Sequence, residues 1–278
     1  MADMIPFTKM HGCGNDFVVI DAREAPVVLD EGALSAMADR RRGVGCDQIV
    51  IVEPARNGAA DVYFRFHNAD GSAAGACGNG TRCVAATLMA ETGTDRIAIE
   101  TVAGLLAATL RPDGLVAVDM GSAMLDWREI PLAEEMDTLH LDVTVGPLGD
   151  PVAVGMGNPH CVFFVADAEA IALDELGPRI ETHALFPERT NVEVATVLAP
   201  DRIRLRVWER GAGLTQACGS GACAVLVASH RRDLTGRAAE IEVDGGVLGV
   251  EWRDDNHVVL TGPVATSFTG ELDEEALA

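Results

Sequence analysis

Two cysteines in this chain of 278 residues occupy positions where a thiol could take part in acid–base chemistry. Cys77 and Cys218 each stand directly before a Gly-x-Gly segment that opens an apolar, helix-forming stretch. A sulfur there faces the free N–H groups and the positive dipole end of the helix, which favour a thiolate over a thiol. The same N–H groups form a site for a carboxylate, and the glycines let a ligand approach the backbone.

A pair of such thiols suits the inversion of a carbon centre. Inversion needs a base on one face of the carbon and an acid on the other, and the two exchange roles with direction. One thiolate and one thiol would supply both if they share a cleft, and the helix N-termini would stabilise charge that develops on the carboxylate. The single lysine, Lys9, argues against a Schiff-base mechanism. We therefore expect neither a cofactor nor a metal.

The two cysteines lie at matching places in an internal repeat. Four residues of the first half recur in the second at offsets of 141 to 143 positions: Asn15 as Asn158, Gln48 as Asn191, Asn68 as Glu209, and Cys77 as Cys218. An offset that is nearly constant along the whole segment indicates a duplicated domain. We assign residues 1–122 to an N-terminal half, 123–262 to a C-terminal half that opens with an acidic, irregular connector, and 263–278 to a tail.

Each copy has the pattern of several strands and one strong helix. Alternating polarity predicts strands at 62–67 and 203–208, and β-branched runs predict others at 17–21, 49–53, 97–101 and 115–120. The central helices are predicted at 79–91 and 220–232, with Asn79 and Ser220 as N-caps and Gly93 and Gly236 ending them. A further helix is expected at 32–41. The chain is therefore predicted to be α+β, as two α/β domains related by a pseudo-two-fold axis, each a curled, mostly antiparallel sheet around its helix.

The two copies differ in ways that suit a substrate with two unlike ends. Asn68 is replaced in the second copy by Glu209, which is followed by Arg210. An adjacent acid and base can bind an ammonium and a second carboxylate. His160 has no counterpart, since Phe17 stands at its place, and a histidine near a thiol can tune its pKa. The alternative is that these asparagines are turn residues and the histidine is structural.

Composition argues against several other classes of protein. The net charge of -22 gives no basic surface for nucleic acid, and no apolar run is long enough to cross a bilayer. The N-terminus lacks the features of a signal peptide, so a soluble cytoplasmic protein is expected. An odd number of cysteines without a C-x-x-C pair argues against a disulfide framework. The five cysteines outside the helix starts are expected to be inert and buried: Cys13, Cys46, Cys83, Cys161 and Cys223.

Four motifs make the chain resemble the diaminopimelate epimerase family. They are M-H-G-C-G-N-D-F-V-V-I-D, A-C-G-N-G-T-R-C, G-N-P-H-C-V and E-R-G-A-G-x-T-x-A-C-G-S-G-A-C-A, in the family's order and spacing. The resemblance implies interconversion of LL- and meso-diaminopimelate, in lysine and peptidoglycan biosynthesis, without pyridoxal phosphate or metal. It also implies a homodimer, and a last strand near 264–270 that returns to the first domain.

The same resemblance implies roles for individual residues. Cys77 and Cys218 are similar to the acid/base pair, and His160 and Glu209 to residues that tune the thiols. The reacting carboxylate would be held by the N–H groups of Gly78, Asn79, Gly219 and Ser220. The distal carboxylate would be bound by Asn68, Asn158, Asn191 and Arg210, with Asn15, Gln48 and Glu209 completing the site.

Two alternatives remain open. One is a related cofactor-independent isomerase of the same fold, such as a proline-racemase-like or phenazine-biosynthesis-type enzyme. The paired cysteines, with Glu209 and Arg210 for a second polar end, argue against it. The other is a thiol redox protein in which Cys77 and Cys218 form a reversible disulfide. Proton exchange at the α-carbon of a supplied amino acid distinguishes these possibilities.

Overall fold

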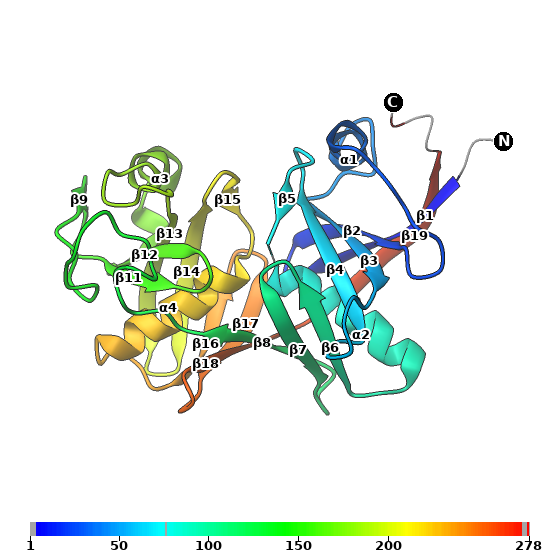
Figure 1. The fold of residues 1–278 in the computed structure, drawn as a ribbon. Coiled ribbons are helices and arrows are strands. Elements are labelled where there is room, and N and C mark those ends of the chain that lie inside the picture. The colour runs from blue at the N-terminus through cyan, green and yellow to red at the C-terminus, as the bar shows by residue number, and fades with distance from the viewer. Residues whose placement is uncertain (1–3, 76, 274–276, 278) are drawn as a thin grey trace. The chain divides into compact units, whose positions relative to one another are not determined.

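The computed structural model describes residues 4–75, 77–273 and 277, and its contacts divide the chain into two units whose elements are labelled in Figure 1. Unit 1 comprises Met1–Val118 and Gly262–Ala278, and unit 2 comprises Asp119–Thr261. Ala76, directly before the first helix-start cysteine, lies outside the described residues, as do the extreme ends of the predicted N-terminal half and tail. In the described parts of the chain, no helix is long and apolar enough to cross a membrane.

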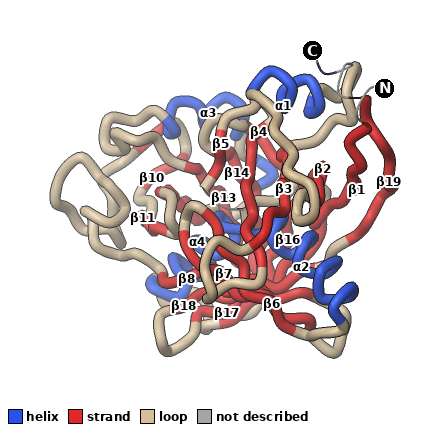
Figure 2. Tube along the Cα trace, turned by 45° about the vertical axis from the view of Figure 1, so that its right-hand side comes forward, coloured by secondary structure: helices blue, strands red, loops and turns tan. Residues whose placement is uncertain are grey.

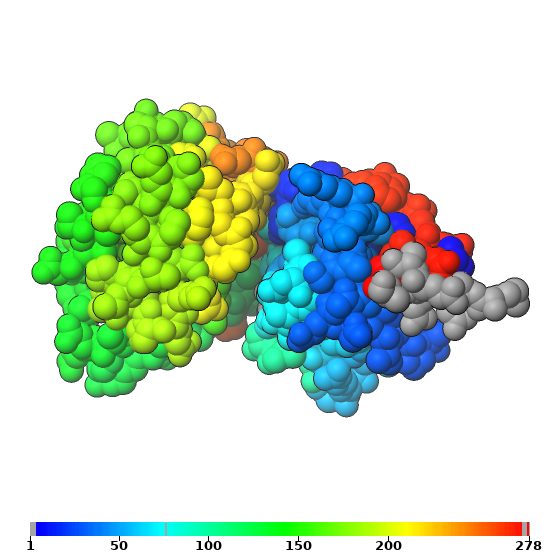
Figure 3. Space-filling model, turned by 90° about the horizontal axis from the view of Figure 1, so that it is seen from above, coloured from blue at the N-terminus to red at the C-terminus, as the bar shows by residue number. Residues whose placement is uncertain are grey.

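Unit 1 is built on one mixed sheet. Its strands are β1 (Met4–Gly12), β2 (Asn15–Asp21), β3 (Gln48–Pro54), β4 (Val62–Asn68), β5 (Ala73–Ala74), β6 (Arg96–Thr101), β7 (Gly104–Leu110) and β19 (Ala265–Asp273). The order is β19-β1-β2-β3-β4-β6-β7, with β5 beside the end of β4. The pairs β2–β3 and β4–β6 are parallel and the rest antiparallel. β19 lies along the full length of β1 (Figure 2), and Figure 3 shows the C-terminal segment beside N-terminal residues on the surface of this unit.

Unit 2 repeats this pairing scheme. Its strands are β11 (Val152–Gly155), β12 (Pro159–Phe164), β13 (Asn191–Ala199), β14 (Arg202–Glu209), β15 (Gly213–Thr215), β16 (Ala238–Val243), β17 (Gly246–Trp252) and β18 (His257–Gly262), and β8 (Val116–Ser122) carries the chain in from unit 1. The pairs β12–β13 and β14–β16 are parallel, at the places where unit 1 has its parallel pairs. The register agrees too, since Phe17 opposes Gln48 and His160 opposes Asn191. The predicted duplication and mostly antiparallel pairing are confirmed.

A central helix fills the curve of each sheet. In unit 1, α2 (Gly78–Thr92) contacts β1 and β2 near one end of the strand order and β6 and β7 at the other. In unit 2, α4 (Gly219–Arg231) likewise contacts both β11 and β17. A sheet whose two ends reach the same helix must be curled, so the predicted curl is confirmed. The central positions of α4 are entirely buried, and each buried Val or Leu stabilises the unit by about 1.5–3 kcal/mol.

Two more helices lie on the outer faces of the sheets. α1 (Glu31–Ala38) packs on β3, and is shorter than predicted at its C-terminal end. α3 (Leu173–Glu181), which follows the short helix η1 (Ala168–Ala170), was not predicted, because Gly177 and Pro178 interrupt its pattern. The connector at 125–150 is not merely irregular: it forms a hairpin, β9 (Thr144–Val145) with β10 (Leu148–Gly149). Its apolar side chains pack with α3 in a core of unit 2, among them Ile130, Leu141, Val143 and Leu148.

Candidate active site

The central helices begin at the two cysteines themselves. The Cys77 sulfur accepts the Gly80 N–H at 3.5 Å, and the Cys218 sulfur accepts the Gly221 N–H at 3.4 Å. Each sulfur is therefore the N-cap side chain of its helix. The prediction that Asn79 and Ser220 are the N-caps is wrong, because both lie inside the first turn. Of the predicted helix ends, Gly93 is the C-cap of α2, in the left-handed conformation with φ of 67°.

The C-terminal end of α4 also differs from the prediction. The C-cap is Arg232 rather than a residue at Gly236. Arg232 donates through its side chain to the carbonyls of Leu139 and Asp150, and its own N–H binds the Ala228 carbonyl. The next residue, Asp233, adopts the left-handed conformation with φ of 56°, and the Leu234 N–H binds the Ser229 carbonyl, so the helix ends on an aspartate rather than at Gly236.

In unit 1, two groups of predicted site residues are held by hydrogen bonds. Asn15 accepts through Oδ1 from Asn79 Nδ2 at 3.0 Å, and the same oxygen lies 3.9 Å from the partly exposed Cys77 sulfur. Gln48 Nε2 donates to Asn68 Oδ1 at 3.1 Å across the β3–β4 pair. Asn15 thus joins the thiol group, whereas Gln48 and Asn68 form a second group at the end of the same sheet.

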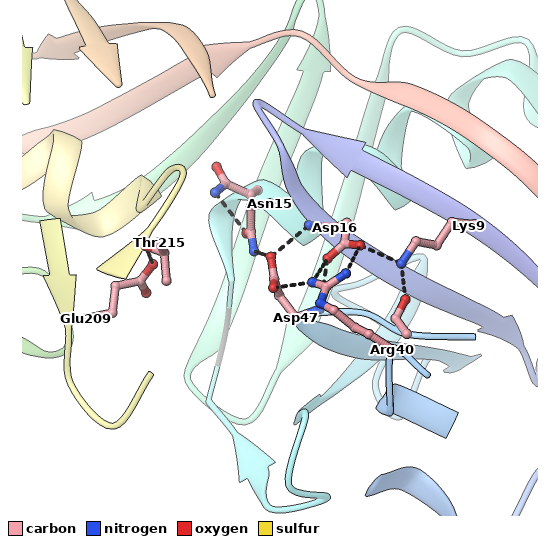
Figure 4. A network of polar contacts seen from close by, with 9 residues as sticks. Lys9, Asn15, Asp16, Arg40, Asp47, Glu209 and Thr215 are labelled. Carbon is pink, nitrogen blue, oxygen red and sulfur yellow. Dashed lines mark hydrogen bonds and ion pairs between the residues drawn. The ribbon is translucent and has the colours of Figure 1, made fainter. Parts of the chain in front are cut away.

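In unit 2, the predicted residues surround the buried thiol of Cys218. Ser220 Oγ lies 3.5 Å from the sulfur, and Glu209, at the end of β14, accepts a hydrogen bond from Thr215 (Figure 4). Burial raises the pKa of the Glu209 carboxyl, although hydrogen bonds from Thr215 and Cys218 oppose this. The Gly219 and Ser220 positions form the first turn of α4, as expected for N–H groups that bind an anion.

The environment of Cys218 favours the thiol over the thiolate. Burial raises the pKa of the Cys218 thiol well above its usual value, and the charges of Glu209 and Glu193 raise it further. Full burial shifts a pKa by up to 3–5 units, about 4–7 kcal/mol, whereas a helix N-terminus supplies at most about 2 kcal/mol. The Gly221 N–H at the helix start lowers the pKa of the Cys218 thiol, as expected, but burial and the two carboxylates outweigh this effect.

This assignment predicts how Cys218 reacts with iodoacetamide. Because only the thiolate reacts and the folded-state pKa is raised, we expect slow labelling at pH 7 that increases only above about pH 9. Glu209→Gln removes one negative charge, so the midpoint should move to lower pH. The measurement is the pH dependence of Cys218 labelling by mass spectrometry in a Cys77→Ala background. Glu240→Gln, at an exposed position, is the control, and a wild-type midpoint below pH 9 would contradict the assignment.

A residue that the sequence interpretation missed lies beside this thiol. Glu193 is fully buried on β13, and its Oε1 lies 2.7 Å from His160 Nδ1. His160 Nε2 in turn lies 2.9 Å from Asn158 Oδ1. A signal was present in the sequence, because Glu193 interrupts an apolar strand at the position where the first copy has Val50.

A cavity of about 360 Å³ lies within unit 2. Two predicted carboxylate-binding residues, Asn158 and Arg210, line it. Arg210 Nη1 donates to the Glu188 carbonyl at 3.0 Å, which holds the guanidinium at the cavity wall. Asn191, the other predicted carboxylate-binding residue of unit 2, uses both ends of its amide on the main chain: Nδ2 donates to the Pro159 carbonyl and Oδ1 accepts the Arg210 N–H. Asn191 therefore shapes the turn that carries Arg210.

The lysine and the other five cysteines are buried in the fold. Lys9 is buried and donates to the Asp16 carboxylate and to the Gly45 carbonyl (Figure 4). The five other cysteines are all buried, and burial raises the pKa of both Cys46 and Cys83 to about 12. Among the residues that the structure describes, no group of three or more His, Cys, Asp or Glu side chains could hold a metal ion.

The fold and the paired helix-capping thiols define a racemase- or epimerase-type enzyme. The solved structure of a probable proline racemase from Agrobacterium radiobacter K84, with bound carbonate, superposes with a TM-score of 0.71 and covers 99% of this chain and 96% of that one. The two sequences are 18% identical, so this likeness concerns the fold alone.

Sequence comparison then gives the family. The family model for diaminopimelate epimerase matches residues 7–125 and 152–267, one segment for each copy of the repeat. A diaminopimelate epimerase from Rhodospirillum centenum is 62% identical over 98% of this chain and 93% of its own length. Another, from Acidiphilium cryptum, is 58% identical over the full length of both. The chain belongs to the diaminopimelate epimerase family.

Proposed function

We propose that this protein interconverts LL- and meso-diaminopimelate with two cysteines, one of which removes the α-proton while the other delivers a proton to the opposite face of the carbon. The observation that carries the proposal is that each copy of the repeat caps its central helix with a cysteine sulfur, in a chain of this family. The N–H groups of Gly78, Asn79, Gly219 and Ser220 bind the reacting carboxylate and stabilise the charge that develops on it.

The two thiols have different roles in the resting enzyme. Cys218 enters the reaction as the acid, since its surroundings favour the thiol. Cys77 is then the base that removes the α-proton from one face of the substrate. Cys218 gives its proton to the opposite face, which leaves the carbon inverted, Cys77 as the thiol and Cys218 as the thiolate. The reverse reaction exchanges the roles, and neither an imine nor a metal takes part.

The distal end of the substrate is bound separately from the reacting centre. Arg210 and Asn158, which line the cavity in unit 2, bind the distal carboxylate, together with Asn68. Glu209 binds an ammonium group, and Asn15, Gln48 and Asn191 complete and shape the site. The enzyme acts in the cytoplasm as a homodimer, in lysine and peptidoglycan biosynthesis.

The test is deuterium incorporation into LL-diaminopimelate in heavy water, with no added cofactor. We expect label at the α-carbon together with formation of the meso isomer, followed by NMR and chiral chromatography. Exchange that occurs with L-proline and not with diaminopimelate would instead indicate the proline-racemase-like alternative. Activity that persists in excess dithiothreitol would argue against the redox alternative, because that function requires a disulfide.

A further inference from the structure

The two copies differ in the pair of side chains beneath the start of the central helix. In unit 1 this pair is apolar: Phe17 on β2 and Val50 on β3. In unit 2 the register places His160 and Glu193 at the same positions. A Cβ on Gly80 would lie 3.2 Å from the Phe17 ring, and a Cβ on Gly221 would lie 2.9 Å from Glu193 Oε1. An ionisable pair in unit 2 therefore occupies the strand positions that hold an apolar pair in unit 1.

Burying the ionisable pair in unit 2 costs more folding free energy than burying its apolar counterpart in unit 1. His160 and Glu193 are both fully buried, and Glu193 Oε2 has no hydrogen-bond partner among the described residues. Burial raises the pKa of the Glu193 carboxyl, and its Oε1 lies 2.7 Å from His160 Nδ1, so a hydrogen bond joins the two side chains. Packing alone gives no reason for this arrangement, since valine fills the matched position in unit 1.

The His160–Glu193 pair holds the amide of Asn158. Glu193 binds the Nδ1 edge of the His160 ring, so the Nε2 edge faces Asn158, and Nε2 donates to Asn158 Oδ1 at 2.9 Å because an amide oxygen can only accept. The amino group of Asn158 is thereby turned toward Ser220, with Nδ2 3.4 Å from Oγ. Asn158 presents a hydrogen-bond donor to the Cys218 loop.

Asn15, the residue matched to Asn158, is held the other way round. Its Nδ2 donates at 2.8 Å to Asp47, and a carboxylate can only accept, so the amide orientation is assigned by this contact. Asp47 itself accepts from Arg40 and from the Asp16 N–H (Figure 4). The Asn15 carbonyl oxygen is left facing Asn79 and the Cys77 sulfur.

A network of ion pairs, buried at Lys9 and exposed at Arg40, holds this second anchor in place. The Asp16 carboxylate accepts from Arg40 and from Lys9, the single lysine of the chain (Figure 4). Although burial opposes ionisation, these hydrogen bonds hold the pKa of Asp16 well below its usual value. Arg40 bridges Asp16 and Asp47, so the charge on one carboxylate fixes the position of the other.

We propose that Asp47 and Glu193 are positioning residues that hold the matched asparagines in opposite amide orientations, Asp47 acting directly on Asn15 and Glu193 acting on Asn158 through His160. The Cys77 loop then faces a carbonyl oxygen, which suits an ammonium or a thiol, and the Cys218 loop faces an amino group, which suits a carboxylate. Asparagine could thereby bind two different groups of the substrate, an ammonium through its carbonyl oxygen and a carboxylate through its amino group. The inference rests on the proposed function and deepens it.

Two double-mutant cycles on the full-length enzyme test this. Asp47→Ala is expected to lower kcat/KM for diaminopimelate at least tenfold, but by less than twofold in an Asn15→Ala background. Glu193→Val, which installs the residue of the first copy, should behave in the same way toward Asn158→Ala. Asp47→Asn and Glu193→Gln keep the hydrogen-bonding shape and should stay within about threefold of wild type.

Controls separate positioning from a general loss of stability. Asp21→Ala removes another carboxylate–arginine pair from β2 and should leave kcat/KM unchanged. The side-chain amide resonances of Asn15 and Asn158, identified by their loss in the alanine variants, should shift in Asp47→Ala and Glu193→Val respectively. These resonances decide the inference even if wild-type enzyme fails to exchange diaminopimelate, which would overturn only the proposed function. Unchanged resonances, or fully additive cycles in an active enzyme, would overturn the inference.

Discussion

Replacing either Cys77 or Cys218 by alanine is expected to lower the rate of epimerisation by about 10²- to 10⁴-fold, the usual contribution of a positioned acid or base. The physical reason is that inversion needs a proton donor and a proton acceptor on opposite faces of the carbon. A single remaining thiol can remove a proton and return one from solvent only on its own face. Each variant should therefore retain slow deuterium exchange without inversion.

The two variants should differ in the isomer that they label. We expect one to incorporate deuterium into the LL isomer with retention and the other into the meso isomer, as measured by NMR after chiral separation. Cys83→Ala, a buried position on the same helix as Cys77, is the matched control and should keep normal inversion. If either helix-start variant inverts its substrate at the wild-type rate, the two-thiol mechanism is wrong.

Arg210→Ala is expected to raise the KM for diaminopimelate by about 10- to 150-fold, which corresponds to the loss of one hydrogen bond between charged groups. The guanidinium lines the cavity in unit 2 and is fixed by the Glu188 carbonyl, so its removal leaves a bound carboxylate without its cation. The effect on kcat should be smaller, because the proposed function places Arg210 at the end of the substrate remote from the reacting carbon.

Arg210→Lys provides the matched comparison for this prediction. It keeps the charge but loses the planar fork that binds both carboxylate oxygens, so an intermediate KM is expected. Steady-state kinetics with both variants measure the effect directly. A KM that is unchanged in Arg210→Ala would show that the distal carboxylate is bound elsewhere.

Much of the fold could be predicted because the sequence contains it twice. A constant offset aligned Phe17 with His160 and Gln48 with Asn191, and the strand registers agree with both alignments. The central helices were found because Ala, Val and Leu fill much of their interiors. α3 was missed because Gly177 and Pro178 break its local pattern, while the contacts that stabilise it come from the distant connector.

The electrostatics of the site could not be predicted in the same way. The helix-start pattern indicated a favoured thiolate at Cys218, but the direction of its pKa depends on burial and on Glu193 and Glu209, which only the folded chain brings near it. The N-cap roles of the sulfurs were also missed, since asparagine and serine are the more common capping residues. Glu193 was detectable by comparing the two copies strand by strand, because it places a charged residue at the position where the first copy has Val50.

The pairing of β19 with β1 has a consequence for the order in which the protein folds. Unit 2 is one continuous stretch of chain, whereas the edge of unit 1 is closed by residues 265–273, which leave the ribosome after all of unit 2. During synthesis, one edge of β1 therefore lacks its native partner while about 140 further residues are translated and unit 2 can already assemble. An open strand edge is a place where chains associate wrongly. The edge of β1 is thus the part of unit 1 that stays unpaired longest during synthesis.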